Sequence, residues 1–83
     1  MEKSIYSKDY GLFLRLLREA RENAGVTQEQ LGQRLHQTQS FISKCERGER
    51  RLDVVETRAI CKALGISLAD LVKDFERALK RTS

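Results

Sequence analysis

Several residue types that would point to a particular fold or site are absent or scarce in this chain of 83 residues. It contains no proline, and only 6% of its residues are aromatic. Sandwiches of short strands are rich in turn-forming and aromatic residues, so this composition favours an all-α helical bundle. No apolar run approaches the ~18 residues of a membrane span, and the N-terminus MEKSIYSKDY lacks the apolar core of a signal peptide. We therefore expect a cytoplasmic protein.

Residues for metal, redox or catalytic chemistry are equally few. The two cysteines, Cys45 and Cys61, lack CxxC spacing, and His36 is the single histidine. A structural zinc site needs four such ligands, so we expect no metal and no other cofactor. In the cytoplasm both cysteines should be reduced and buried. The chain also has no nucleophile–base pair and no phosphate loop, which makes an enzyme the poorest hypothesis.

Apolar residues recur at three- and four-residue steps, the period of amphipathic helices. Thr27 with Gln30 and Asp53 with Glu56 have the spacing of capping boxes, which begin helices. Glycines, which adopt the left-handed conformation easily, follow the expected helix ends. The five predicted helices span residues 8–24, 27–36, 38–48, 53–65 and 67–80.

Length and composition indicate one small domain with an excess of positive charge. We expect the domain to cover residues 8–80, between a flexible tail at 1–7 and a flexible C-terminus at 81–83. Sixteen Lys and Arg residues against twelve Asp and Glu give a net charge of +4 and a pI near 9.4. A pI above about 9 is compatible with a polyanionic partner, although many basic proteins bind none.

The stretch TQSFISKCERGERRLD, residues 38–53, predicts a helix with a face of hydrogen-bond donors. At about 100° per residue, Ile42 and Cys45 form a narrow stripe that faces inward. The outward side has no acid and presents Gln39, Ser40, Ser43, Lys44 and Arg47. Gln can pair with adenine and Lys with guanine in the major groove of DNA, and arginines after the helix can neutralise phosphates. A solvated face on an ordinary bundle is the alternative.

The residues before this helix favour the DNA interpretation. TQEQLGQRLHQTQSFISKCE predicts a short helix, a turn of three or four residues and a second short helix, which is the helix-turn-helix plan. Gly32 lies inside the first of these helices, where glycine costs about 1 kcal/mol relative to alanine. We expect a packing reason for it, namely the close approach of the next helix.

Three stretches resemble the Xre-type, phage-repressor-like helix-turn-helix family: LREARENAGVTQEQLGQRL, TQSFISKCERGERRLDVVE and ALGIS, within about residues 12–68. The resemblance implies a compact five-helix bundle of the lambda-repressor-like type. It also implies that the third helix lies in the DNA major groove, usually in a homodimer on a near-palindromic operator.

The resemblance further implies roles for individual residues. Gln28 corresponds to a phosphate-binding glutamine, and Arg21 with Glu46 to a structural ion pair. Bases would be read by Gln39, Ser40, Ser43 and Lys44, and the DNA backbone held by Arg47, Arg50 and Arg51. His36 stands where the family usually has glycine, so a left-handed backbone there would cost about 1 kcal/mol. Phe41 can touch a thymine methyl or pack on the ERRL loop, and we favour packing.

These observations support two functional hypotheses. The first is a sequence-specific regulator of transcription on double-stranded DNA, most simply a repressor associated with the nucleoid. It would bind as a homodimer with half-sites about 34 Å apart. Phe75 and Leu79 on the last helix are our candidates for the dimer interface, although they can equally complete the core of the monomer. The second hypothesis is an antitoxin-like or adaptor module whose protein partner, such as a toxin, binds the last helix.

Overall fold

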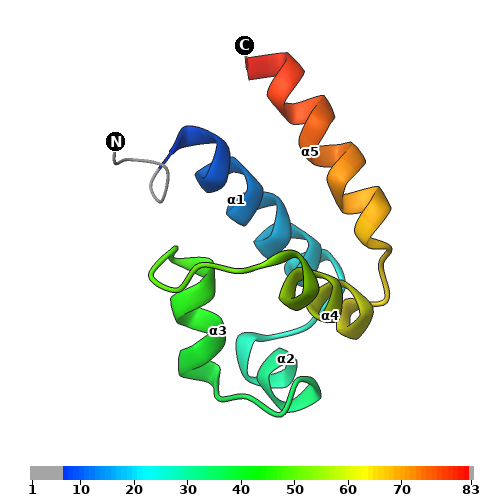
Figure 1. The fold of residues 1–83 in the computed structure, drawn as a ribbon. Helices are drawn as coiled ribbons and strands as arrows, with labels where there is room; N and C mark the ends of the chain where they lie inside the picture. The colour runs from blue at the N-terminus through cyan, green and yellow to red at the C-terminus, as the bar shows by residue number, and fades with distance from the viewer. Residues whose placement is uncertain (1–6, 83) are drawn as a thin grey trace.

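The computed structural model describes residues 7–82, and these fold into five α-helices and no strands (Figure 1). The helices are α1 (Lys8–Asn23), α2 (Gln28–Arg34), α3 (Gln39–Glu46), α4 (Val54–Leu64) and α5 (Leu68–Thr82). The predicted all-α bundle of five helices is thus confirmed. The helix bounds differ from the predicted ranges by at most two residues; Ser7, which was assigned to the flexible tail, caps α1, and α5 continues to Thr82. Residues 1–6 and 83 of the predicted flexible ends lie outside the described residues.

Local capping determines where the helices begin, as the sequence predicted. In the first capping box, the Thr27 hydroxyl accepts the Gln30 N–H at 3.0 Å, and the Gln30 side chain accepts the Thr27 N–H at 2.9 Å. Asp53 and Glu56 form the same reciprocal pair at the start of α4. These bonds satisfy backbone N–H groups that have no partner within the helix.

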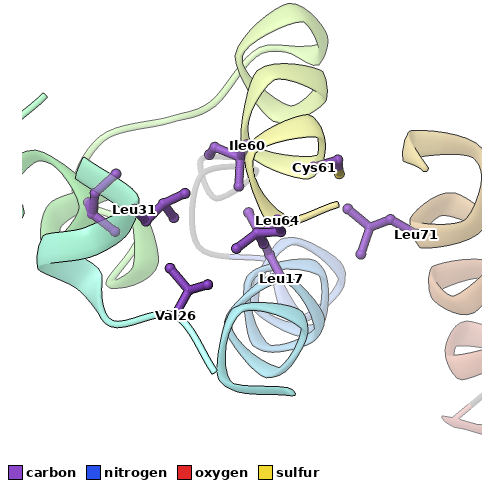
Figure 2. Close-up of a cluster of buried hydrophobic side chains, with 8 residues drawn as sticks. Leu17, Val26, Leu31, Ile60, Cys61, Leu64 and Leu71 are labelled. Atoms are coloured by element: carbon purple, nitrogen blue, oxygen red, sulfur yellow. The ribbon is translucent and has the colours of Figure 1, made fainter. Parts of the chain in front are cut away.

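One apolar cluster joins all five helices (Figure 2). Its buried members are Leu17, Val26, Leu31, Ile42, Ile60, Cys61, Leu64 and Leu71. Figure 2 shows Leu31 on the α2 side of this core, and Cys61 beside Leu71 on the α5 side. Cys45 and Cys61 are free thiols and buried, as predicted. Burial raises the pKa of both thiols, so each stays protonated at neutral pH.

The turn between α2 and α3 explains the glycine inside α2. A Cβ atom on Gly32 would lie 2.8 Å from the carbonyl oxygen of Gln37, closer than real contacts allow. The Gln37 N–H donates to the Gly32 carbonyl at 2.7 Å, which holds the turn against the helix. His36 has a φ of +58°, so the predicted left-handed backbone is confirmed at this residue. Gly32 is therefore present because the turn backbone touches it.

Helix α5 packs along α1, and Figure 1 shows the two helices side by side. The rings of Phe13 and Phe75 meet edge to face with centroids 5.7 Å apart. Aromatic pairs prefer this geometry because the positive edge of one ring faces the negative face of the other. Phe75 therefore contributes to packing within the chain.

Candidate nucleic-acid interface

Helix α3 presents the predicted donor face to solvent. Its inward stripe is almost fully covered, with Ile42 1% and Cys45 2% exposed. On the other side the side chains of Gln39, Ser40 and Lys44 are exposed. The Thr38 hydroxyl accepts the Phe41 N–H at 3.0 Å and so begins the helix at Gln39. Three of the predicted base readers are therefore accessible to a ligand from solvent.

A buried ion pair fixes the far end of α3 to α1. Arg21 Nε donates to Glu46 Oε2 at 2.6 Å and Arg21 Nη2 to Glu46 Oε1 at 3.1 Å, with side chains 9% and 8% exposed. Arg21 Nη1 also donates to the Val26 carbonyl at 2.9 Å. A planar guanidinium that makes three directed bonds holds its partner in one orientation. The structural pair implied by the family resemblance is therefore present.

Gln28 joins this pair, which sequence reasoning did not foresee. Its Nε2 donates to Glu46 Oε1 at 2.8 Å, so the side-chain amide nitrogen is directed toward the protein. The contact links the start of α2 to the end of α3, and no local sequence pattern marks it. The phosphate contact predicted for Gln28 remains a prediction.

Ser43 and Arg47 are brought together at the end of α3. Arg47 Nη1 donates to Ser43 Oγ, and Arg47 Nε donates to Glu49 Oε2 at 2.8 Å. The bond to Glu49 raises the pKa of the Arg47 guanidinium and lowers the pKa of the Glu49 carboxyl. Both side chains of this pair are 54% exposed, so water screens it and a phosphate can compete for the arginine.

Arg50 has a different environment from Arg47. Its Nη2 donates to Glu56 Oε2 at 2.6 Å, and its Nη1 donates to the Arg51 carbonyl at 3.2 Å. The guanidinium carbon lies 4.8 Å from the centre of the Phe41 ring. The favoured prediction for Phe41, packing on the ERRL loop, agrees with this contact.

Tyr10 holds the same loop from α1. Its hydroxyl accepts the Leu52 N–H at 3.1 Å, and the Arg51 guanidinium lies 4.4 Å from the centre of its ring. Sequence reasoning did not single out Tyr10. The partner backbone is 42 residues away, so no short-range spacing could have indicated it.

The predicted dimer residues lie along the contact between α5 and α1. Phe75 packs on Phe13, as described above, and Leu79 is half-buried beside the start of α1. Larger apolar exposure occurs elsewhere, at Val54 (67%), Val55 (73%) and Val72 (45%). These valines were not among the predicted interface residues, and the interface assigned to Phe75 and Leu79 remains a prediction.

Two further properties of the described residues bear on the class of protein. Between residues 7 and 82 no helix has the length and apolar character needed to cross a membrane. Over the same range, no group of three or more His, Cys, Asp or Glu side chains is placed to hold a metal ion.

Comparison with known proteins identifies the family. A family model described as a helix-turn-helix domain matches residues 10–73. Among solved structures, an XRE-family like protein from Pseudomonas syringae pv. tomato str. DC3000 is similar, with a TM-score of 0.83 and 43% sequence identity over 92% of this chain and 93% of that one. A search among curated proteins gave no match. The chain therefore belongs to the Xre-type helix-turn-helix family of DNA-binding transcription regulators.

Proposed function

We propose that this protein is a transcriptional repressor that binds a specific double-stranded DNA operator as a homodimer and inserts α3 into the major groove. Its family supports DNA-binding regulation in general and is typically non-enzymatic. The observation that carries the proposal is the exposed donor face of α3, held in one orientation by the buried Arg21–Glu46 pair. A rigid helix with accessible donors can meet base edges without first being ordered.

Base reading is assigned to the exposed side chains at the start and middle of α3. Gln39 can make paired hydrogen bonds to adenine, and Lys44 can donate to the acceptors of guanine. Ser40 is short enough to let the helix backbone approach the groove. Ser43 accepts a bond from Arg47 in the free protein, so a base contact by Ser43 requires that bond to be exchanged.

Phosphate contacts are assigned to Arg47 and Arg51, which follow α3 in the loop of residues 47–53, and to Gln28 at the start of α2. Contacts of this kind position a protein on the duplex and carry no direct sequence information. Arg50 also belongs to the predicted phosphate set, and that contact remains a prediction. In the free protein its guanidinium bonds to Glu56 and lies over the Phe41 ring.

Dimerisation would supply the second recognition helix, since one helix per site gives few base contacts. Half-sites about 34 Å apart would place the two copies of α3 in successive major grooves on one side of the duplex. We propose that the interface involves Phe75 and Leu79 on α5. Equilibrium sedimentation at tens of micromolar should show a dimer, and only monomer at that concentration would refute this part.

A protein-interaction role is the second candidate, favoured by one observation. Val72 on α5 is 45% exposed, so α5 has apolar surface that its own chain does not cover. An antitoxin-like or adaptor protein would bind its partner, for example a toxin, through that helix. This candidate predicts that the purified chain is monomeric alone and forms a stable complex with the product of an adjacent gene.

Selection from a random pool of DNA duplexes tests the proposed function directly. Duplexes retained by the purified protein should contain two related half-sites in near-palindromic arrangement, with centres one helical turn apart. A pool that shows no enriched sequence, together with no binding of any duplex at low ionic strength, would overturn the proposal.

A further inference from the structure

The loop of residues 47–53 contains three arginines, and the side chain of Arg50 contacts two helices as well as the loop. Its charged group bonds to Glu56 of α4, bonds to the Arg51 carbonyl and lies over the Phe41 ring of α3. The Arg50 N–H also donates to the Lys44 carbonyl at 3.3 Å. Arg50 therefore connects the recognition helix, the loop and α4.

Glu56 is placed to do two things at once. Its Oε1 accepts the Asp53 N–H at 3.0 Å and so completes the cap of α4. Its Oε2 accepts Arg50 Nη2 at 2.6 Å. One carboxylate thus fixes the end of the loop to the start of α4 and fixes the Arg50 side chain to the same point. A charge-assisted bond of this length is stronger than a neutral one and is directional.

An acid at this position is unexpected if Arg50 serves only to attract phosphate. A carboxylate beside the loop repels the DNA backbone and competes with phosphate for the same guanidinium. The geometry is consistent with a different role for Glu56, because its bond to Arg50 Nη2 holds the guanidinium over the Phe41 ring. Tyr10 adds a second attachment, since its hydroxyl accepts the Leu52 N–H at 3.1 Å and its ring lies under Arg51.

We propose that Arg50 is a positioning residue for DNA binding, anchored by Glu56, and that together with Tyr10 it holds the loop of residues 47–53 in the conformation that presents Arg47 and Arg51 to phosphate. The proposal rests on the proposed function for its DNA ligand. It replaces direct phosphate binding by Arg50 with the bridge from α3 to α4.

The substitution Glu56→Gln tests the proposal because the two possible roles of Arg50, phosphate ligand and positioning residue, predict opposite changes in DNA affinity. Glutamine keeps the cap, since its carbonyl oxygen can still accept the Asp53 N–H. Its amide NH₂ cannot accept from Arg50, so the bridge is lost while the net charge rises by one. If Arg50 is a phosphate ligand restrained by Glu56, DNA binding becomes tighter. If Arg50 positions the loop, binding to the selected duplex weakens, by about three- to tenfold.

Glu49→Gln is the matched control in the same loop. It also removes one acid that is paired with an arginine, but Glu49 contacts only the exposed Arg47 in the bonds described above. This control should bind DNA more tightly than the unchanged protein. Arg50→Lys adds a second test, since lysine keeps the charge but not the planar fork whose two nitrogens donate to Glu56 and to the Arg51 carbonyl. It should bind as weakly as Arg50→Ala.

Amide hydrogen exchange of the free protein tests whether Glu56 orders the loop when no DNA is present. The N–H groups of Glu49, Arg50 and Leu52 donate within the loop region and report its order. Glu56→Gln should speed exchange at these amides and leave those of the α1 interior unchanged. Unchanged exchange in the loop, tighter DNA binding by Glu56→Gln, or full affinity in Arg50→Lys would each overturn the proposal. If the unchanged protein binds no duplex, the proposed function fails, and the exchange result still decides whether Glu56 orders the loop.

Discussion

Arg21 and Glu46 form a two-bond ion pair, at 2.6 and 3.1 Å, that fixes the end of α3 to α1. Both side chains are almost fully covered, so each charge is stabilised by its partner and hardly by water. Breaking such a pair on one side leaves an uncompensated buried charge, which typically costs about 3–5 kcal/mol. This contact therefore helps to set the orientation of α3, together with the Gln28–Glu46 bond and the burial of Ile42.

Glu46→Ala should destabilise the protein by about 3–5 kcal/mol, because Arg21 and the Gln28 amide both lose their acceptor. Urea unfolding followed by circular dichroism measures the change. Arg18→Ala is the control, since the Arg18–Glu22 pair is 60% and 51% exposed. Exposed pairs contribute about 0.2–1 kcal/mol. Equal effects of the two substitutions would contradict the role given to Glu46.

Gly32→Ala should destabilise the fold although alanine is the better helix former. The new methyl group would lie 2.8 Å from the Gln37 carbonyl oxygen, so the turn must move, at about 1–3 kcal/mol. Gly11→Ala in α1 is the matched control, because no heavy atom lies within 4 Å of the added Cβ. It should stabilise by about 0.5–1 kcal/mol. Thermal unfolding compares the two, and a stabilising Gly32→Ala would show that the turn is not tightly packed.

His36→Gly should stabilise the protein by about 0.5–1 kcal/mol. A non-glycine residue at a φ of +58° is strained by about 1–2 kcal/mol. Glycine removes this strain, but its greater backbone entropy in the unfolded chain offsets part of the gain in stability. Denaturant midpoints give the difference. A loss of stability would mean that the imidazole makes a compensating contact.

Acid should weaken the attachment of the loop. The bond from Arg50 holds the pKa of the Glu56 carboxyl below its ordinary value, with a smaller effect from the Asp53 N–H. A carboxyl whose pKa is lower in the folded protein stabilises it above the unfolded pKa of about 4.3, and loses that effect as pH falls through the folded pKa. The difference in melting temperature between the unchanged protein and Glu56→Gln should therefore be present at pH 6 and shrink below about pH 4. A difference in melting temperature that grows on acidification would contradict stabilisation by the ionised Glu56 carboxylate.

Arg51→Ala should weaken binding to all duplexes alike. Loss of one phosphate contact reduces the slope of log K against log salt by about 0.9 and leaves the preference among sequences unchanged. Titrations at several salt concentrations with a preferred and a random duplex measure both quantities. A change in sequence preference would show that Arg51 reads bases.

Much of the fold could be predicted from the sequence because its signals are local. The Thr27 and Asp53 caps and the apolar period act within a few residues, and each places a helix end nearly independently of the rest of the chain. The exposed donor face of α3 also follows from helical spacing once Ile42 and Cys45 are assigned inward. The left-handed backbone at His36 came from the family resemblance.

The contacts that could not be predicted join residues far apart in the chain. Tyr10 binds the Leu52 backbone, and Gln28 donates to Glu46, because the packing of α1, α2 and α3 brings these residues together. The spacing of residues in the sequence does not indicate such tertiary contacts. The position of Arg50 between Glu56 and Phe41 was likewise not indicated by its sequence neighbours, Glu49 and Arg51.

The most direct test is the DNA preference of Lys44→Ala. The unchanged protein and the variant would each be titrated with a duplex from the selected pool and with a duplex altered at one base of each half-site. The unchanged protein should discriminate between the two duplexes, and Lys44→Ala should lose about 1–3 kcal/mol on the selected duplex and discriminate less. Equal binding of both duplexes by the unchanged protein, or full discrimination by the variant, would contradict base reading by α3.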